Sequence, residues 1–162
     1  MCKFLTEQQV IAKFGKADKT GSSYLVNLQL PYPMRLSWDL KTTVTKVRVH
    51  KLILENYKSL FSDLLDHYGY EKLVELRIDV FGGIYSYRAM RGGTKLSRHS
   101  WGIAIDLDPV NNGLRSTNKT ASFAGAEYKA MLDIFKKNGF MSLGVEKNYD
   151  WMHYEIGSSI LN

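Results

Sequence analysis

The chain has 162 residues, of which 44% are hydrophobic and 23% charged, with three prolines, one cysteine and a formal net charge of +6. This composition excludes a disordered chain, the single cysteine excludes an internal disulfide, and no apolar run approaches the roughly 18 residues of a membrane-spanning helix. The length predicts one domain over residues 1–162. The basic balance favours nucleic acid, anionic membranes or bacterial wall polymers as partners, although a solvated basic surface explains it equally well.

The N-terminal part predicts a short helix and then a strand. Thr6 and Gln9 have the spacing of a capping box, and the helix that they begin ends near Phe14. Residues 15–23 form a polar loop. Residues 24–30 predict a strand, which the Pro-Tyr-Pro that follows should end.

A longer helix is predicted next, capped by Thr45, reaching about His67 and terminated by Gly69. Its apolar residues recur with a period of 3.6 residues: Val49, Ile53, Tyr57, Leu60, Phe61, Leu64 and Leu65. Structural or surface roles are expected for its two histidines, His50 and His67. Residues 73–81 then alternate as a half-buried strand, and residues 82–93 predict a loop or an irregular strand.

The second half predicts a strand over residues 101–108, a polar loop over 111–122, a helix over about 124–138 and a last strand over 149–156. Ser122 is placed to cap the helix, and a glycine follows its end. Helices and strands mix without regular βαβ alternation. The sequence therefore predicts an α+β fold, a small, largely antiparallel sheet with helices packed on one side.

The predicted strand over 101–108 has one unusual face. One face carries large apolar residues, whereas the other carries two very small residues followed by two carboxylates, in the order Gly102, Ala104, Asp106 and Asp108. The small residues leave room for a substrate backbone to lie close to the strand.

Two histidines have carboxylates near them in the sequence. His99 precedes Asp106 by seven residues, and His153 follows Asp150 by three. Two histidines and a carboxylate that leave one position open to water form a ligand set typical of catalytic zinc, and a further carboxylate can take that water's proton. Spacing alone leaves the alternative open, because a histidine near a strand is more often hydrogen-bonded in a core than bound to a metal.

Two motifs resemble those of a known family. Residues 97–106, SRHSWGIAID, resemble the SxHxxGxAxD signature of the M15 zinc peptidases, which include VanY-like D-Ala-D-Ala carboxypeptidases and phage L-alanyl-D-glutamate endopeptidases. Residues 150–155, DWMHYE, resemble the second signature, an acidic residue three positions before the second zinc histidine. Arg88 stands where the family carries an arginine before the first motif. The resemblance spans about residues 30–157 and implies a Hedgehog/D-Ala-D-Ala-peptidase-like fold.

The resemblance implies a role for each matched residue. His99, Asp106 and His153 would bind Zn²⁺. Asp150 would be the general base and acid, and Arg88 would hold a substrate oxygen or the developing oxyanion.

Other residues keep two interpretations each. Ser97 would contact the substrate or orient the loop, and Arg88 has a plain ion pair as its alternative. Asp108, before a proline, is expected to form a turn rather than bind a second metal. Glu155 would either orient His153 or pair with a lysine. Packing roles are expected for three aromatic residues, one of which can line the groove: Tyr149, Trp151 and Tyr154.

The chain departs from the family pattern in two places. Many relatives have Glu where Asp150 stands, and residues 139–149 lack the Trp-Gly-Gly run that many relatives carry. In one regular strand, Asp150 and His153 would face opposite sides. We therefore place Asp150 in a loop or bulge before the strand, start the strand at about Trp151, and expect His153 and Glu155 to share a face.

These observations predict a zinc metallopeptidase that hydrolyses peptide bonds in bacterial peptidoglycan stem peptides. The preferred subtype is an L-Ala–D-Glu endopeptidase of a phage or prophage, an endolysin. The alternatives are a D-Ala-D-Ala carboxypeptidase or dipeptidase of the same family and a non-catalytic wall-binding module. The N-terminus lacks the apolar region of a secretory signal, so we expect a protein made in the host bacterial cytoplasm that acts on the wall after release. We also expect a monomer that binds peptidoglycan peptides and no nucleic acid.

Overall fold

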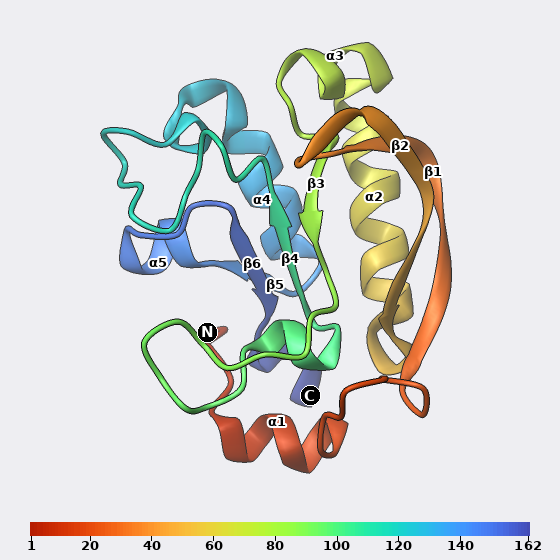
Figure 1. Ribbon diagram of the computed structural model, residues 1–162. Coiled ribbons are helices and arrows are strands. Elements are labelled where there is room, and N and C mark those ends of the chain that lie inside the picture. The colour runs from red at the N-terminus through yellow and green to blue at the C-terminus, as the bar shows by residue number, and fades with distance from the viewer.

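A six-stranded sheet runs through the protein, which we describe from a computed structural model of residues 1–162 (Figure 1). The strands lie in the order β2-β1-β3-β4-β6-β5, and all neighbouring pairs are antiparallel except the parallel pair of β1 and β3. Their bounds are β1 (Leu25–Leu36), β2 (Asp39–His50), β3 (Val80–Gly83), β4 (Ala104–Leu107), β5 (Phe140–Ser142) and β6 (His153–Ile156). This largely antiparallel sheet, with its helices, confirms the predicted α+β fold.

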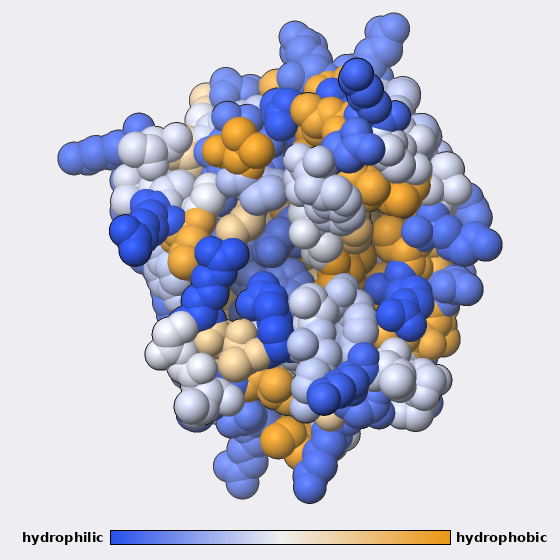
Figure 2. All heavy atoms as spheres, viewed as in Figure 1, coloured by the Kyte–Doolittle hydropathy of each residue, from blue (hydrophilic) through white to orange (hydrophobic).

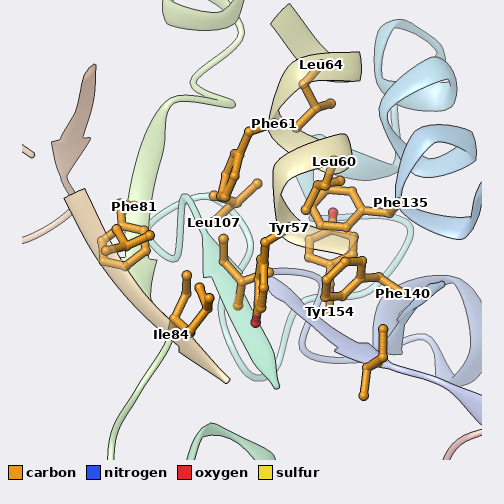
Figure 3. Close-up of a cluster of buried hydrophobic side chains, with 14 of the residues drawn as sticks. Tyr57, Leu60, Phe61, Leu64, Phe81, Ile84, Leu107, Phe135, Phe140 and Tyr154 are labelled. Carbon is orange, nitrogen blue, oxygen red and sulfur yellow. The ribbon is translucent and has the colours of Figure 1, made fainter. Parts of the chain in front are cut away.

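The α-helices are α1 (Glu7–Phe14), α2 (Leu54–Tyr68), α3 (Tyr70–Glu75), α4 (Lys129–Lys137) and α5 (Leu143–Lys147). None is long and apolar enough to cross a membrane. In Figure 1, α2 and α4 lie behind the strands, and Figure 3 shows their apolar side chains packed against the sheet. Tyr57 and Phe61 of α2 are fully buried, and the ring of Phe135 in α4 stacks on Tyr154 of β6 with centroids 3.8 Å apart. Because successive strand residues alternate between faces, the residues beside Tyr154 point to the opposite face.

The predicted long helix is wrong in its first part. Residues 39–50 form β2, which pairs with β1 in a long hairpin, and a 3₁₀ turn at Lys51–Ile53 leads into α2. The β-branched residues of KTTVTKVRV favour an extended chain, so the helical spacing of Val49 is coincidental. His50 therefore ends a strand rather than lying within a helix. The predicted end of α2 before Gly69 is confirmed.

The prediction that Pro-Tyr-Pro ends the first strand is also wrong, because β1 continues to Leu36. Its register with β2 shifts between Gln29 and Met34. Pro31 and Pro33 lie within this irregular stretch, where no regular ladder needs the N–H groups that prolines lack.

The strand predicted over residues 73–81 is mostly helix and turn. α3 ends at Glu75, Arg77 adopts a left-handed φ of 61°, and β3 begins only at Val80. The apolar residues of this segment are buried by two different elements, which together imitate the alternation of a strand. Leu73 is buried on α3, whereas Ile78 and Val80 are buried after the turn.

Three boundaries in the second half differ from the prediction. A 3₁₀ helix occupies Arg98–Trp101, so β4 begins at Ala104. Two short 3₁₀ turns follow Ser122, so α4 begins at Lys129. β6 begins at His153, and the sequence did not predict β5 and α5, which are too short to display a period.

The N-terminal segment lies beside the end of β6. Lys3 N donates to Ser158 Oγ over 2.8 Å, and Phe4 forms a β-bridge with Gly157. The capping box before α1 is confirmed, since Gln9 N donates to Thr6 Oγ1 over 3.1 Å. These contacts bring residues 3–5 to the open side of the sheet, beside the polar side chains of β6.

Candidate metal centre

His99 is held in the 3₁₀ helix that precedes β4. Ser97 caps this helix, its Oγ accepting from His99 N at 3.3 Å. The His99 ring is buried, and its Nδ1 lies 2.9 Å from the carbonyl oxygen of Ile84. That carbonyl can only accept, so Nδ1 donates and Nε2 keeps its lone pair. Ser97 thus caps the short helix that carries His99.

Asp106 and His153 face each other across two antiparallel strands. They are register partners in β4 and β6, and His153 Nδ1 lies 3.2 Å from Asp106 Oδ1. His99 Nε2 lies 3.2 Å from Asp106 Oδ2. A side chain at Gly82 would crowd this position, because its Cβ would come within 3.0 Å of the Asp106 Cβ. One ligand atom from each of His99, Asp106 and His153 lies within 4.8 Å of the other two, so the three could hold a metal ion.

The surroundings of Asp106 favour the charged form of its carboxylate. Burial would raise the pKa of Asp106, but the two imidazoles beside it hold the pKa below its usual range. Burial would lower the pKa of His153, but hydrogen bonds to Asp106 and Glu155 raise the pKa to about 10. A cation is therefore stabilised between these groups, whether it is a proton or a metal ion.

Asp150 lies in the turn before β6, as predicted from its spacing to His153. It adopts a left-handed φ of 51°, and its carbonyl accepts from His153 N at 3.0 Å. In a regular strand, residues three positions apart would face opposite sides, but this turn lets the side chains of Asp150 and His153 line the same cavity. Asp150 is buried, its Oδ1 has no hydrogen-bond partner, and burial raises the pKa of its carboxyl group.

A cavity of about 480 Å³ opens over the cluster, and Asp150, Arg88 and Ser97 all line it. Figure 2, in the same view as Figure 1, shows a hollow over β4 and β6 lined by hydrophilic residues. The Arg88 side chain is exposed, and its backbone N donates to Ser100 Oγ over 3.1 Å. Arg88 forms no ion pair with a protein carboxylate.

Several cavity residues were not predicted from the sequence. They come from the N-terminal segment, the loop before the first motif, the first motif itself and α5: Phe4, Leu5, Arg91, Arg98 and Lys147. Phe4 and Leu5 are more than 80 positions from the motifs, and nothing in their local sequence indicates this contact. Arg98 lies inside the first motif, but at a position that the signature leaves open.

The remaining candidates lie in different environments. Asp108 is fully buried and pairs with Arg77, with 3.0 Å between Oδ1 and Nη2, so it holds the turn after β4 as expected. Tyr149 lines the cavity, whereas Trp151 and Tyr154 are buried. His50 and His67 lie outside the cavity. Glu155 shares the face of His153, as expected, and its ion-pair partner is Arg98 rather than a lysine.

The donor set fits a divalent metal ion. The buried His99 Nε2 is close to Asp106 but has no hydrogen-bond partner, which leaves its lone pair free inside the cavity. Two imidazoles and one carboxylate from three separate elements are also the ligand types that zinc prefers in catalytic sites.

Comparison with known proteins identifies the segment that carries this site. Residues 91–156 match a family model described as D-alanyl-D-alanine carboxypeptidase. The searches of curated proteins and of solved structures give no match. The matched segment contains the whole three-residue cluster and Asp150, while Arg88 lies just before it. Residues 91–156, which carry the site, are therefore similar to the M15 family of peptidases.

Proposed function

We propose that the protein is a zinc metallopeptidase that hydrolyses peptide bonds in the stem peptides of bacterial peptidoglycan. The observation that carries the proposal is the convergence of His99, Asp106 and His153 in one cavity with a fourth, unpartnered carboxylate, that of Asp150. A binding module has no need of this fourth group, so the arrangement favours an enzyme over wall attachment alone.

His99, Asp106 and His153 would hold the metal ion. When bound, zinc supplies a Lewis acid that polarises the scissile carbonyl and lowers the pKa of a water molecule to about 7. The three side chains are fixed before the ion binds. A backbone carbonyl holds His99, and the pairing of β4 with β6 places Asp106 opposite His153, whose ring is held by the carboxylate of Glu155. Little ordering is then required when the ion enters.

Asp150 would act as the general base and then as the general acid. Its free Oδ1 takes a proton from the attacking water and delivers it to the leaving amine. Burial raises the pKa of this carboxyl group, which makes it a better proton acceptor than an exposed aspartate. Arg88, at the exposed edge of the cavity, would hold a substrate oxygen or the developing oxyanion, and Ser97 would contact the substrate near it.

For the bond cleaved, we propose an L-Ala–D-Glu endopeptidase of the phage endolysin type, acting as a monomeric single domain. Two features support this subtype. Asp150 stands where phage endopeptidases of the resembling family also carry the shorter acid, and the net charge of +6 suits a polyanionic wall. The description of the matched family model favours a second candidate, a D-alanyl-D-alanine carboxypeptidase.

Digestion of purified sacculi separates these candidates. The zinc-loaded protein should clear the suspension and expose new D-Glu amino termini, detected by mass spectrometry, without any rise in reducing sugar. A chelator-treated sample and an Asp150→Asn variant serve as controls. Release of D-Ala from intact walls would identify the carboxypeptidase instead. Binding to the wall without any cleavage would overturn the enzyme proposal.

A further inference from the structure

Each histidine of the cluster has one ring nitrogen committed to a fixed hydrogen-bond acceptor. For His99 this is Nδ1, which faces the carbonyl of Ile84. For His153 it is Nε2, which lies 2.9 Å from Glu155 Oε1. The two remaining nitrogens, His99 Nε2 and His153 Nδ1, each lie 3.2 Å from a different oxygen of Asp106. The two rings therefore use opposite nitrogens toward the same point.

Glu155 owes its position to the strand and to an arginine. It follows His153 by two residues on β6, so both side chains project from one face. Its other oxygen, Oε2, lies 3.8 Å from Arg98 Nε. Arg98 is itself anchored, because its Nη2 donates to the carbonyl of Leu5 over 3.0 Å. Glu155 is thus a buried carboxylate held between a histidine and an arginine.

The environment of Glu155 differs from that of Asp150 in a way that separates their roles. Both Glu155 oxygens face a positively charged or N–H-bearing partner, whereas Asp150 Oδ1 has none. A carboxylate engaged at both oxygens is poorly placed to accept a proton from water, but it is well placed to fix a ring.

We infer that Glu155 is a positioning residue that fixes His153 as an Nδ1 metal ligand, and that Arg98 keeps Glu155 in place. This inference rests on the proposed metal site. By accepting the Nε2–H, Glu155 selects the tautomer whose lone pair is on Nδ1, prevents the ring from rotating, and makes the ligand more basic. Through Arg98, the same chain of contacts reaches the N-terminal segment at Leu5.

Zinc affinity tests the inference without any activity measurement. Glu155→Met removes the acceptor at similar volume, and Glu155→Gln keeps an oxygen but loses the charge. Competition with a chromogenic chelator should give a zinc Kd weaker by about 10- to 100-fold for Glu155→Met, with Glu155→Gln between it and the wild type. Glu71→Met, at an exposed position on α3, is the matched control and should bind zinc like the wild type.

The nitrogen that binds the metal is tested independently in the wild-type protein. Imidazole ¹⁵N chemical shifts of the zinc-loaded protein should show His153 bound through Nδ1 and protonated at Nε2, and His99 the reverse. This measurement decides the matter even if Glu155→Met fails to fold. Binding of zinc through His153 Nε2, or an unchanged Kd in folded Glu155→Met, would overturn the inference. Failure of the wild type to bind zinc at all would instead overturn the proposed metal site.

Discussion

At the scale of single residues, the site divides its polar groups between binding an ion and moving a proton. The inward-facing ring nitrogens of His99 and His153 converge on Asp106, and each ring is held from its far side by a fixed acceptor. Asp150 stands apart from this network, with one oxygen free and its backbone in the left-handed region. The structure therefore predicts different phenotypes for substitutions within one cavity.

Removing either histidine should abolish metal binding. His99→Ala and His153→Ala each leave only two ligands, which is too few for a tightly held zinc ion. Elemental analysis of protein purified without added metal should find about one zinc per wild-type chain and almost none in either variant. His67→Ala, exposed at the end of α2, should keep full occupancy. Full zinc content in either cluster variant would show that the ligands are wrongly assigned.

Replacing the proposed base should leave the metal and remove the rate. Asn tolerates the left-handed backbone that Asp150 adopts, so Asp150→Asn should fold and bind zinc normally. Its rate of stem-peptide hydrolysis should fall by about 10²- to 10⁴-fold, the usual contribution of a general acid–base group. Asp66→Asn, an exposed change of the same kind on α2, is the control. Near-normal turnover in Asp150→Asn would move the proton transfer to another group.

At the scale of elements, local signals were sufficient for some predictions and insufficient for others. The capping box at Thr6 and the glycine after α2 act within one turn of helix, and both were predicted correctly. The helix predicted through residues 45–50 does not form, because the β-branched residues of this stretch favour the extended chain of β2 despite the helical spacing of its apolar residues. The parallel pairing of β1 with β3 joins residues some 45 positions apart, as between Arg35 and Val80, and no local pattern indicates it.

The candidate site shows the same limit. Spacing gave His99 and Asp106 as neighbours along the chain, but bringing His153 opposite Asp106 requires the antiparallel pairing of β4 with β6. The family resemblance predicted that His153 lies close to Asp106, whereas the periodicity of the apolar residues did not. The contribution of Phe4 and Leu5 to the cavity depends on the packing of the N-terminal segment along β6, which neither source predicted.

The turn between the 3₁₀ helix and β4 offers a stability test at this scale. Gly102 has φ 72°, and a Cβ there would lie 2.7 Å from Leu25 Cδ2 and 3.1 Å from His50 N. Gly102→Ala should therefore lower the free energy of unfolding for two reasons. Overpacking costs about 1–3 kcal/mol, and the left-handed backbone of a residue with a Cβ costs about 1–2 kcal/mol more. Gly92 has φ 75° with open space around it, so Gly92→Ala isolates the backbone term. Urea unfolding should rank Gly102→Ala as clearly less stable, and equal midpoints would contradict this packing.

At the scale of the whole molecule, His50 contacts several elements that lie far apart in the sequence, including the segment that carries His99. Its ring packs edge-on against Phe14 of α1 and stacks on Tyr24, with centroids 4.8 Å and 5.4 Å away respectively. Its Nδ1 accepts from Leu52 N at 3.1 Å, and its backbone N donates to the carbonyl of Gly102. A charge on this ring would disturb the N-terminal helix, the hairpin and the loop that carries His99 together.

The titration of His50 predicts how stability depends on pH. Burial disfavours the charged ring and lowers the pKa of His50 to about 4, from an ordinary value of 6.5. Between these two values the unfolded chain binds more protons than the folded one, so the free energy of unfolding rises with pH in this window. The contribution of the neutral His50 ring to the free energy of unfolding is therefore intact above about pH 6.5, and it is lost progressively as the pH falls to about 4.

His50→Asn tests this prediction, because asparagine keeps an acceptor for Leu52 N but does not titrate. Zinc-free wild type and variant share every other titrating group, so the difference between their urea midpoints isolates His50. The variant should be less stable near neutral pH, because it loses the packing against Phe14 and Tyr24. The gap should narrow as the pH falls from 6.5 to 4, since only the wild type must then keep a buried imidazole uncharged. Two parallel curves across this range would mean that His50 is protonated equally easily in the folded and unfolded chains.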